Sequence, residues 1–244
     1  MAADALRVRG THTIGDAWTS GHNHFNAIRL FAAWLVIYGH AWAITGTPGG
    51  DLLARATGFK YAGAIAVDMF FVISGFLIAA SLQRNTVRGY LASRAPLPDW
   101  LANDLWCVVC FITGTAAWLY RDRVRLTWIA VVAFLLVAVL LRGTPYFALP
   151  YFGLVCYGTL WLAFARVPAG FAHHDFSYGL YLYGWPAAQL VQTWSPGGPL
   201  HNVAWASVFA FALAVLSWFC IERPALRFKR AFGTRTPMAS PATG

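Results

Sequence analysis

The sequence predicts an all-α integral membrane protein. Hydrophobic residues make up 59% of the 244 residues and charged residues only 11%, against about 25% charged residues in an ordinary soluble domain. The apolar residues gather in runs close to the roughly 20 residues that a helix needs to cross the hydrocarbon core. Since a backbone in lipid must satisfy its own hydrogen bonds, these runs are expected to be helices.

Seven apolar runs qualify as transmembrane helices. They cover residues 26–46, 62–83, 101–120, 126–142, 147–166, 177–194 and 203–221. The links between them are short and rich in proline and glycine, so the chain has no room for a second soluble domain. We therefore expect a polar N-terminal segment (1–25), a membrane domain (26–222) and a basic cytoplasmic tail (223–244).

The net charge of +9 comes from 18 Lys and Arg residues against 9 Asp and Glu residues. In a soluble protein this excess would suggest binding to nucleic acid. Here the basic residues lie mainly between the apolar runs and in the tail, as the positive-inside rule expects of cytoplasmic segments. The charge is therefore interpreted as a topology signal, with the lipid bilayer as partner and not nucleic acid.

The basic clusters conflict with a simple alternation of seven helices. They follow the second, third and last runs and comprise Arg84, Arg88 and Arg94; Arg121, Arg123 and Arg125; and Arg223, Arg227, Lys229 and Arg230. The clusters after the second and third runs are separated by one crossing, so they cannot both be cytoplasmic. Either one loop keeps its charge outside, or an odd number of helices is missing near residues 94–100.

The first run holds two ionisable side chains, Arg29 and His40. Eleven residues at 100° each come to about 20° past three full turns, so the two side chains share one helix face, roughly 16 Å apart. Ionisable groups inside a bilayer are costly and commonly functional. The alternative is that Arg29 extends to the cytoplasmic interface while His40 caps the far end of the helix.

The second run carries Asp68 beside aromatic residues, where a carboxylate needs a cationic or hydrogen-bonding partner. One interpretation is that Asp68 orients His40 or contacts substrate, and the other is that it compensates the helix dipole. Further along, Ser74 and Gly75 form a small-residue pair that favours close helix packing over a nucleophilic serine. Ser74 is also a candidate substrate-binding residue.

Tyr178, Tyr181 and Trp185 are spaced at i, i+3 and i+7, which places them on one face of the sixth run. These rings are suited to stacking on a sugar ring, and we assign Tyr178 and Tyr181 to substrate binding. An aromatic belt at the membrane interface explains the same spacing.

No metal site is expected. His173 and His174 are adjacent and do not face one another on a helix, and Asp175 suits a helix start. Cys107 and Cys110 form a C-x-x-C inside an apolar run, where they are interpreted as small apolar groups.

Two of these segments together resemble membrane-bound acyltransferase family three, the O-acyltransferases of bacterial surface and secreted glycans. They are Arg29-(ten residues)-His40 and V67-D-M-F-F-V-I-S-G-F-L-I78. Further likeness lies at residues 111–123, at 175–186 and in the I-E-R-P of 221–224. The resemblance implies a multi-pass enzyme of the bacterial inner membrane, with about ten helices, that passes an acyl group, expected to be acetyl from acetyl-CoA, to a carbohydrate hydroxyl.

In that chemistry His40 is the natural general base, because imidazole exchanges a proton near neutral pH. Arg29 keeps its charge and is expected either to anchor part of the donor or to organise the cytoplasmic half of the protein. The family resemblance also gives Arg94 a substrate-binding role, as one member of a basic stretch whose second arginine has no counterpart here. No bound cofactor is expected, because acetyl-CoA acts as a substrate and the chain lacks G-x-G-x-x-G and P-loop motifs.

The chain has seven predicted helices, whereas the family resemblance implies about ten. The difference implies an internal deletion of an odd number of helices near residues 94–100. Three functions follow from this. The chain is an O-acyltransferase, or it is a degenerate or partner-dependent relative in which a homodimer or a partner subunit fills the gap, or it is a transporter whose buried Arg, His and Asp line a pathway. The lack of an inverted repeat argues against the transporter.

Overall fold

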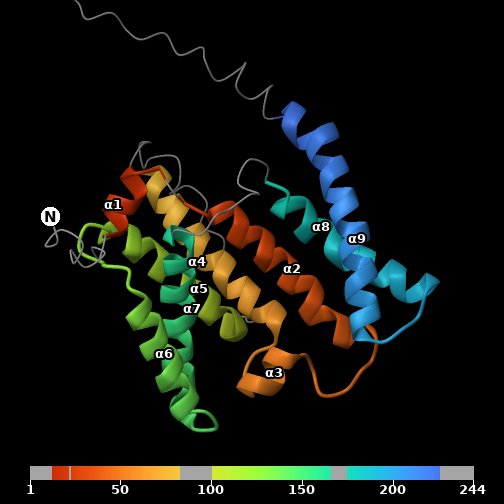
Figure 1. Cartoon of the computed structure of the whole chain (residues 1–244), viewed down its shortest axis with the longest axis horizontal. Helices are drawn as coiled ribbons and strands as arrows, with labels where there is room; N and C mark the ends of the chain where they lie inside the picture. The colour runs from red at the N-terminus through yellow and green to blue at the C-terminus, as the bar shows by residue number, and fades with distance from the viewer. Residues whose placement is uncertain (1–12, 22, 83–100, 166–174, 226–244) are drawn as a thin grey trace, which may run out of the picture.

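The computed structural model describes residues 13–21, 23–82, 101–165 and 175–225. No β-strand element lies among these residues, and their isolated bridge joins Thr13 to Arg125. The predicted all-α class is confirmed (Figure 1). The helices are α1 (Ile14–Thr19), α2 (Phe25–Ile44), α3 (Leu52–Thr57), α4 (Ala62–Leu82), α5 (Leu101–Leu119), α6 (Trp128–Leu140), α7 (Ala148–Phe164), α8 (Ser177–Trp194) and α9 (Pro199–Ser217), with a 3-10 turn η2 (Pro145–Phe147) and a π-helical turn η3 (Trp218–Glu222).

Each of the seven predicted runs coincides with one of the long helices, α2 and α4 to α9. Four segments are both long and apolar enough to cross a membrane by themselves, namely Phe25–Ile44, Ala62–Ser81, Pro145–Phe164 and Pro199–Ala225. The apolar part of α5 and the whole of α6 are shorter, so the number of crossings stays a prediction. The sequence pattern missed α1 and α3, which have 6 residues each.

The outer helices present large apolar side chains on the surface. Leu140 at the end of α6 is 79% exposed, and Leu216 in α9 is 59% exposed. An apolar surface of this kind suits contact with lipid, since lipid chains make no demand for polar partners.

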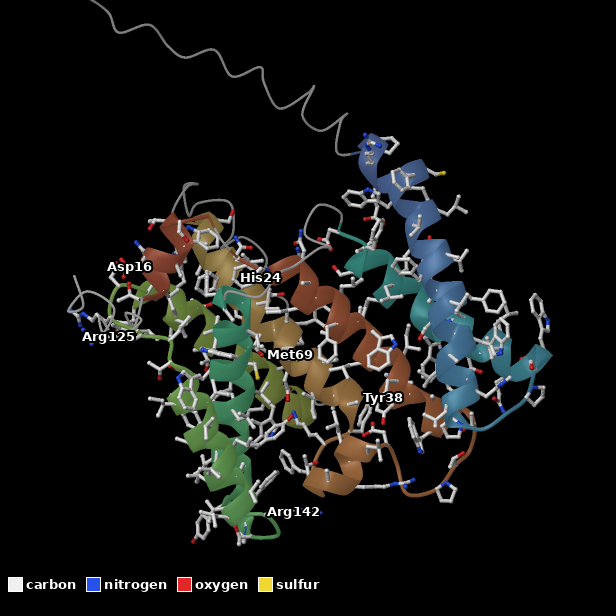
Figure 2. The ribbon with its side chains drawn as sticks, in the orientation of Figure 1. Asp16, His24, Tyr38, Met69, Arg125 and Arg142 are labelled. Atoms are coloured by element: carbon white, nitrogen blue, oxygen red, sulfur yellow. The ribbon has the colours of Figure 1, made fainter. Side chains whose placement is uncertain are left out.

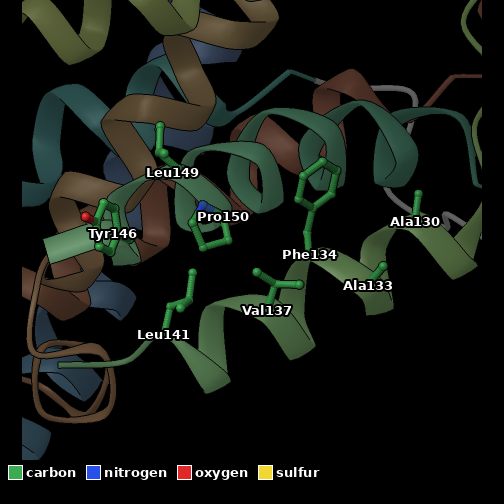
Figure 3. A pocket seen from close by; sticks show the side chains of 8 residues that line it. All are labelled: Ala130, Ala133, Phe134, Val137, Leu141, Tyr146, Leu149 and Pro150. Atoms are coloured by element: carbon green, nitrogen blue, oxygen red, sulfur yellow. The ribbon is translucent and has the colours of Figure 1, made fainter. Parts of the chain in front are cut away.

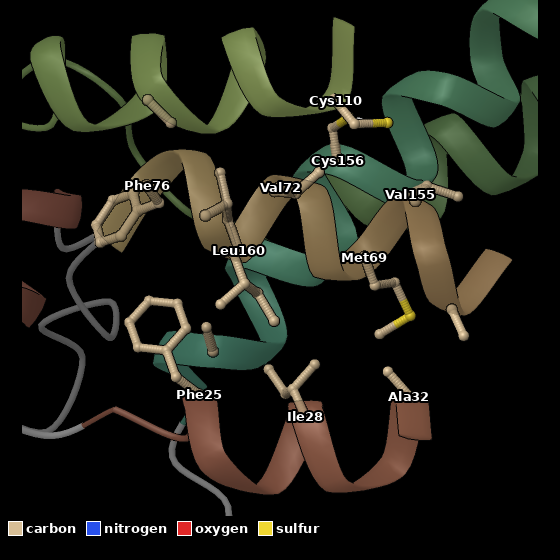
Figure 4. Close-up of a cluster of buried hydrophobic side chains, with 14 of the residues drawn as sticks. Phe25, Ile28, Ala32, Met69, Val72, Phe76, Cys110, Val155, Cys156 and Leu160 are labelled. Atoms are coloured by element: carbon tan, nitrogen blue, oxygen red, sulfur yellow. Dashed lines mark hydrogen bonds between the residues drawn. The ribbon is translucent and has the colours of Figure 1, made fainter. Parts of the chain in front are cut away.

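The core gathers side chains from α2, α4, α5 and α7 (Figure 4). Phe25 and Ile28 of α2 face Met69 and Phe76 of α4, and all four are buried. The segment predicted to be polar, residues 1–25, also contributes, because the ring of Trp18 in α1 lies 5.1 Å from Trp118 and 5.6 Å from Phe76. In its described part this segment is therefore anchored to the bundle.

Consecutive helices α4 and α5 run in the same direction. Near the start of α4, Lys60 Nζ lies 5.8 Å from the ring of Trp106 in α5. Further along, the ring of Phe76 lies 5.2 Å from that of Trp118. Both helices therefore finish at the same end of the bundle, whereas consecutive membrane helices ordinarily alternate.

Helix α2 runs the opposite way to α4. Its first residue, Phe25, packs against Phe76 at 5.5 Å, and Gly39 near its end contacts Gly63 near the start of α4. Helix α7 ends beside α4's end, since Phe164 lies 5.4 Å from Phe25 and 5.7 Å from Phe76. The bundle thus has one end where α2 begins and α4, α5 and α7 finish, and another end that carries α3.

Basic residues collect at the first of these ends, which we call the arginine end. It carries Arg121, Arg123, Arg125 and Arg223. Figure 2 shows Asp16, His24 and Arg125 toward this end and Arg142 at the other, the α3 end. Arg84, Arg88 and Arg94 lie outside the described residues, but they follow α4, which finishes at the arginine end.

The parallel course of α4 and α5 removes the conflict between charge and topology. That conflict came from the expectation that these two runs cross in opposite directions. Because both helices finish at the arginine end, the positive-inside rule predicts the same membrane face for the ends of α4 and α5.

Cysteine labelling tests this topology. In a chain whose four native cysteines are replaced by alanine, we expect Ser81→Cys and Asp122→Cys to react with a membrane-impermeant maleimide from one face. Arg142→Cys is expected to react from the other face. Labelling of Ser81→Cys and Asp122→Cys from opposite faces would contradict the parallel arrangement.

Two glycines allow α4 and α5 to pack closely. A methyl group at Gly75 would overlap the carbonyl oxygen of Phe111, and one at Gly114 would overlap that of Val72. The Thr115 hydroxyl also donates to the Gly75 carbonyl oxygen at 3.2 Å. Gly75 of the Ser-Gly pair therefore serves helix packing.

Gly75→Ala is expected to destabilise the fold by about 1–3 kcal/mol, because the backbone of α5 must move away. Gly158→Ala is the matched control, since a methyl group there would meet no atom within 4 Å. That control should be neutral or stabilising by up to about 1 kcal/mol. Thermal unfolding in detergent measures both, and equal midpoints for the two variants would contradict the close crossing.

Candidate active site

The imidazole of His40 is half-buried near the α3 end of α2. Its Nδ1 lies 2.7 Å from the carbonyl oxygen of Val36. A carbonyl can only accept a hydrogen bond, so Nδ1 must carry the proton and donate. In the neutral ring this leaves the lone pair on Nε2, and Nε2 is therefore the nitrogen that can take a proton from a substrate.

Small residues bring two other helices to His40. Gly39 allows the backbone of α4 to approach at Gly63, and a methyl group at either position would overlap its neighbours. On the other side, a methyl group at Gly184 of α8 would lie 2.7 Å from Cγ1 of Ile37. The close approach of both helices is what allows aromatic side chains beside these glycines to reach the imidazole.

Two aromatic rings contact the imidazole edge to face. The ring of Tyr61, just before α4, lies 5.6 Å from that of His40 at 85°, and the ring of Trp185 in α8 lies 5.0 Å away at 89°. The spacing of Trp185 predicted an aromatic face on α8 but not the contact with His40. No sequence signal connected Tyr61 with His40.

Arg29 lies on the same helix toward the arginine end and is paired by its neighbours. Its Nη2 is 2.9 Å from Oδ2 of Asp175 and donates to Oδ1 of Asn26 at 2.6 Å. Asp175 also accepts hydrogen bonds from the main-chain N–H and the hydroxyl of Ser177 at the start of α8. The carboxylate thus suits a helix start, as the sequence indicated, and ties α8 to α2.

The carboxylate of Asp68 is buried and binds two partners. Lys60 Nζ lies 2.6 Å from its Oδ2, and the Tyr151 hydroxyl donates to the same oxygen at 3.2 Å. The predicted need for a cationic or hydrogen-bonding partner is met. His40, by contrast, takes its orientation from the main-chain carbonyl of Val36, so the orienting function expected of Asp68 is carried by the main chain of α2.

The remaining predicted residues lie apart from the imidazole contacts. Tyr181 packs against Phe70 of α4 at 5.6 Å, and Tyr178 is an exposed residue one turn earlier in α8. Ser74 is half-buried in α4 beside the close crossing with α5. Arg94 lies outside the described residues.

Asp51 is a buried carboxylate that the sequence analysis missed. It caps α3 by accepting from the Ala54 N–H at 2.9 Å, and it accepts from the Ala62 N–H at the start of α4 at 2.8 Å. Burial, with a smaller contribution from the Asp51 carboxylate, raises the pKa of Tyr61 above its ordinary value. The Tyr61 phenol therefore remains a neutral hydrogen-bond donor. An aspartate before a short helical segment was the available signal for the cap.

An apolar groove of about 540 Å³ lies between α6 and α7 (Figure 3). It is lined by Ala130, Ala133, Phe134, Val137, Leu141, Tyr146, Leu149 and Pro150. None of the candidate catalytic residues lines it, and its apolar walls offer no base. The groove therefore lies apart from the candidate catalytic residues.

Three comparisons with known proteins bear on this arrangement. A family model described as "Acyltransferase domain" matches residues 22–97. The O-acetyl transferase of Shigella phage Sf6 is 40% identical over 74 residues, which are 30% of this chain and 21% of that protein. Nodulation protein 10 of Rhizobium leguminosarum bv. viciae is 41% identical over 76 residues, 28% of this chain and 18% of that protein. No solved structure matches the chain.

The chain spans about a fifth of the length of the curated relatives it matches. The matched part nevertheless runs from before α2 to beyond α4 and so contains Arg29, His40 and Asp68. Residues 22–97 of this membrane protein are therefore similar to an acyltransferase domain.

Proposed function

We propose that the protein is a membrane-bound O-acyltransferase that moves an acetyl group from acetyl-CoA to a carbohydrate hydroxyl. The observation that carries the proposal is the imidazole of His40, whose Nε2 is left as the proton acceptor by the bond from Nδ1 to Val36. It stands in a segment that matches an acyltransferase family model. O-Acetyl transfer is also the activity named for the phage relative.

The chemistry requires a base and a place for the donor. Nε2 of His40 takes the proton from the acceptor hydroxyl while the hydroxyl oxygen attacks the thioester carbonyl. The C–S bond then breaks, and the imidazolium returns the proton to the coenzyme A thiolate, which leaves as the thiol. Arg29 lies three turns away on the same face, so it cannot reach the same carbonyl carbon. Its role is to hold an anionic part of the donor, which shares the guanidinium with the Asp175 carboxylate or displaces that carboxylate.

The two groups lie toward opposite ends of α2. Arg29 is in the second turn from the arginine end, and His40 is in the last turns before the α3 end. With the arginine end in the cytoplasm, donor anchoring falls on the side that holds acetyl-CoA and the base on the side of a surface glycan. This supports a multi-pass location in the bacterial inner membrane.

A partner-dependent form of the same enzyme is the second candidate. Loss of an odd number of helices from a ten-helix member would leave its flanking helices parallel, and α4 and α5 are parallel. An internal deletion near residues 94–100 accounts for this arrangement. A second copy or a partner subunit would then cover the polar groups that the missing helices shielded.

Reconstitution of the full chain into liposomes tests the function. Labelled acetyl-CoA and a bacterial O-polysaccharide are supplied, and acetyl transfer to the polysaccharide is measured. Transfer supports the proposal. Acetyl-CoA binding without transfer, with transfer restored by a second subunit, would support the partner-dependent form, and absence of both donor binding and transfer would contradict the proposal.

The donor-anchoring role gives a separate prediction for Arg29. Arg29→Ala should weaken acetyl-CoA binding by roughly tenfold or more, because a charge-assisted hydrogen bond is lost. Asp175→Asn is the control, since it breaks the ion pair but leaves the guanidinium in place. Titration calorimetry measures both variants. Equal weakening by Arg29→Ala and Asp175→Asn would show that the pair matters for helix α8 and not for the donor.

A further inference from the structure

We propose that Tyr61 and Trp185 form the platform that binds a pyranose ring of the acceptor beside His40. The inference rests on the proposed O-acyltransferase function and deepens it by naming the groups that recognise the acceptor. It moves that recognition away from Tyr178 and Tyr181, the residues to which the sequence assigned it.

The first support is position. Both rings contact the imidazole edge to face from two different helices, at 5.6 Å for Tyr61 and 5.0 Å for Trp185. Tyr178 lies seven residues before Trp185, about 10 Å further along α8 toward the arginine end. Tyr181 is turned to Phe70. A sugar whose hydroxyl reaches His40 therefore meets Tyr61 and Trp185 before it meets the other two rings.

The second support is exposure. Tyr61 is 40% exposed and Trp185 is 47% exposed, although each contacts the half-buried imidazole. Each side chain thus keeps surface that the described residues do not cover. The C–H groups of a pyranose carry partial positive charge and suit the negative face of an aromatic ring, and the Tyr61 hydroxyl and the Trp185 indole N–H supply polar contacts.

The third support is that both rings are held in place. Asp51, 1% exposed, accepts from the Ala62 N–H and so fixes the backbone next to Tyr61. Gly184, next to Trp185, lies against Ile37 of α2 and holds α8 close at this level. Rings positioned in advance lose little freedom on binding, which is what a recognition surface needs.

The fourth support is access. His40 lies four residues before the end of α2, about 6 Å from it along the helix axis. Tyr61 belongs to the segment that follows α3, at the end of the bundle opposite the arginine clusters. A large polar glycan can reach this end from water without entering the apolar interior.

Glycan binding is measured without catalysis, so that this test stands apart from the test of transfer. The full chain in liposomes is titrated with tetrasaccharides of glucose, galactose, mannose and rhamnose, and binding is followed by saturation-transfer NMR. Trp185→Ala and Tyr61→Ala should each weaken binding of the best tetrasaccharide by roughly tenfold. Trp185→Phe should retain most of it, and acetyl-CoA binding should be unchanged in all of them.

Tyr178→Ala is the matched control, because Tyr178 is also exposed and lies on the same helix. It should bind the tetrasaccharide like the unmodified chain. Equal affinities of Trp185→Ala and the unmodified chain would overturn the proposal. So would failure of every tetrasaccharide to bind a chain that still binds acetyl-CoA. Glycan binding that depends on Trp185 in a chain without transfer would instead contradict the enzymatic function alone.

Discussion

Replacement of His40 by alanine is expected to lower acetyl transfer by about 10²–10⁴-fold, the usual contribution of a general base. The imidazole of His40 lies on the Arg29 face of α2, and its Nε2 is left as a proton acceptor by the hydrogen bond from Nδ1 to Val36. His40→Gln should lose as much activity, since an amide accepts a hydrogen bond but does not take up a proton at working pH. The initial rate at saturating donor and acceptor is the measurement.

His201→Ala provides the matched control for this variant. His201 lies near the start of α9 and contacts Ser195, with Nε2 3.1 Å from the serine hydroxyl. It takes no part in the proposed site, so its loss should leave transfer within a factor of about two. Activity of His40→Ala within threefold of the unmodified chain would remove His40 from the role of base.

Replacement of Lys60 by methionine is expected to destabilise the fold by about 3–5 kcal/mol, the cost of leaving one member of a buried ion pair behind. Asp68 is 2% exposed, and its Oδ2 lies 2.6 Å from the Lys60 ammonium. Without Lys60 the carboxylate keeps the Tyr151 hydroxyl as its partner among the described residues. Thermal unfolding in detergent micelles should show the loss as a lower midpoint.

The double variant Lys60→Met/Asp68→Asn separates loss of the pair from loss of packing. A neutral amide can still accept from Tyr151, so the double variant should recover most of the stability. Arg142→Met is the control, because Arg142 is an exposed cation at the same end and should change the stability by less than about 0.5 kcal/mol. A double variant no more stable than Lys60→Met would contradict the ion-pair account.

The partners of the ionisable residues could not be predicted from their spacing. One interpretation of Asp68 was that it orients His40. Its cation, Lys60, comes from the link before α4, and Tyr151 lies 83 residues further along the chain. A carboxylate in an apolar interior needs a partner, and the sequence was sufficient to predict that need. Which group supplies the partner depends on the packing of α4 against α7.

The topology was likewise predicted in part from the sequence and decided in part by packing. The positions of the apolar runs predicted all seven long helices, because the backbone N–H and C=O groups of each run must form hydrogen bonds within that run. The charge clusters also indicated a conflict between the second and third runs, but left open whether one loop keeps its charge outside or helices are missing. The parallel direction of α4 and α5 became visible only from ring contacts at both ends and from the glycine crossing between them.

The sequence by itself determined the all-α membrane class, the helix positions and the common face of Arg29 and His40. These are local properties, since twist, rise and apolar length are the same wherever the helix packs. The tertiary structure decided that Asp175 pairs with Arg29, that Val36 orients His40, and that Tyr61 and Trp185 flank the imidazole. Apart from Val36, those neighbours come from other segments, and only the close approach of α2, α4 and α8 at their glycines brings them together.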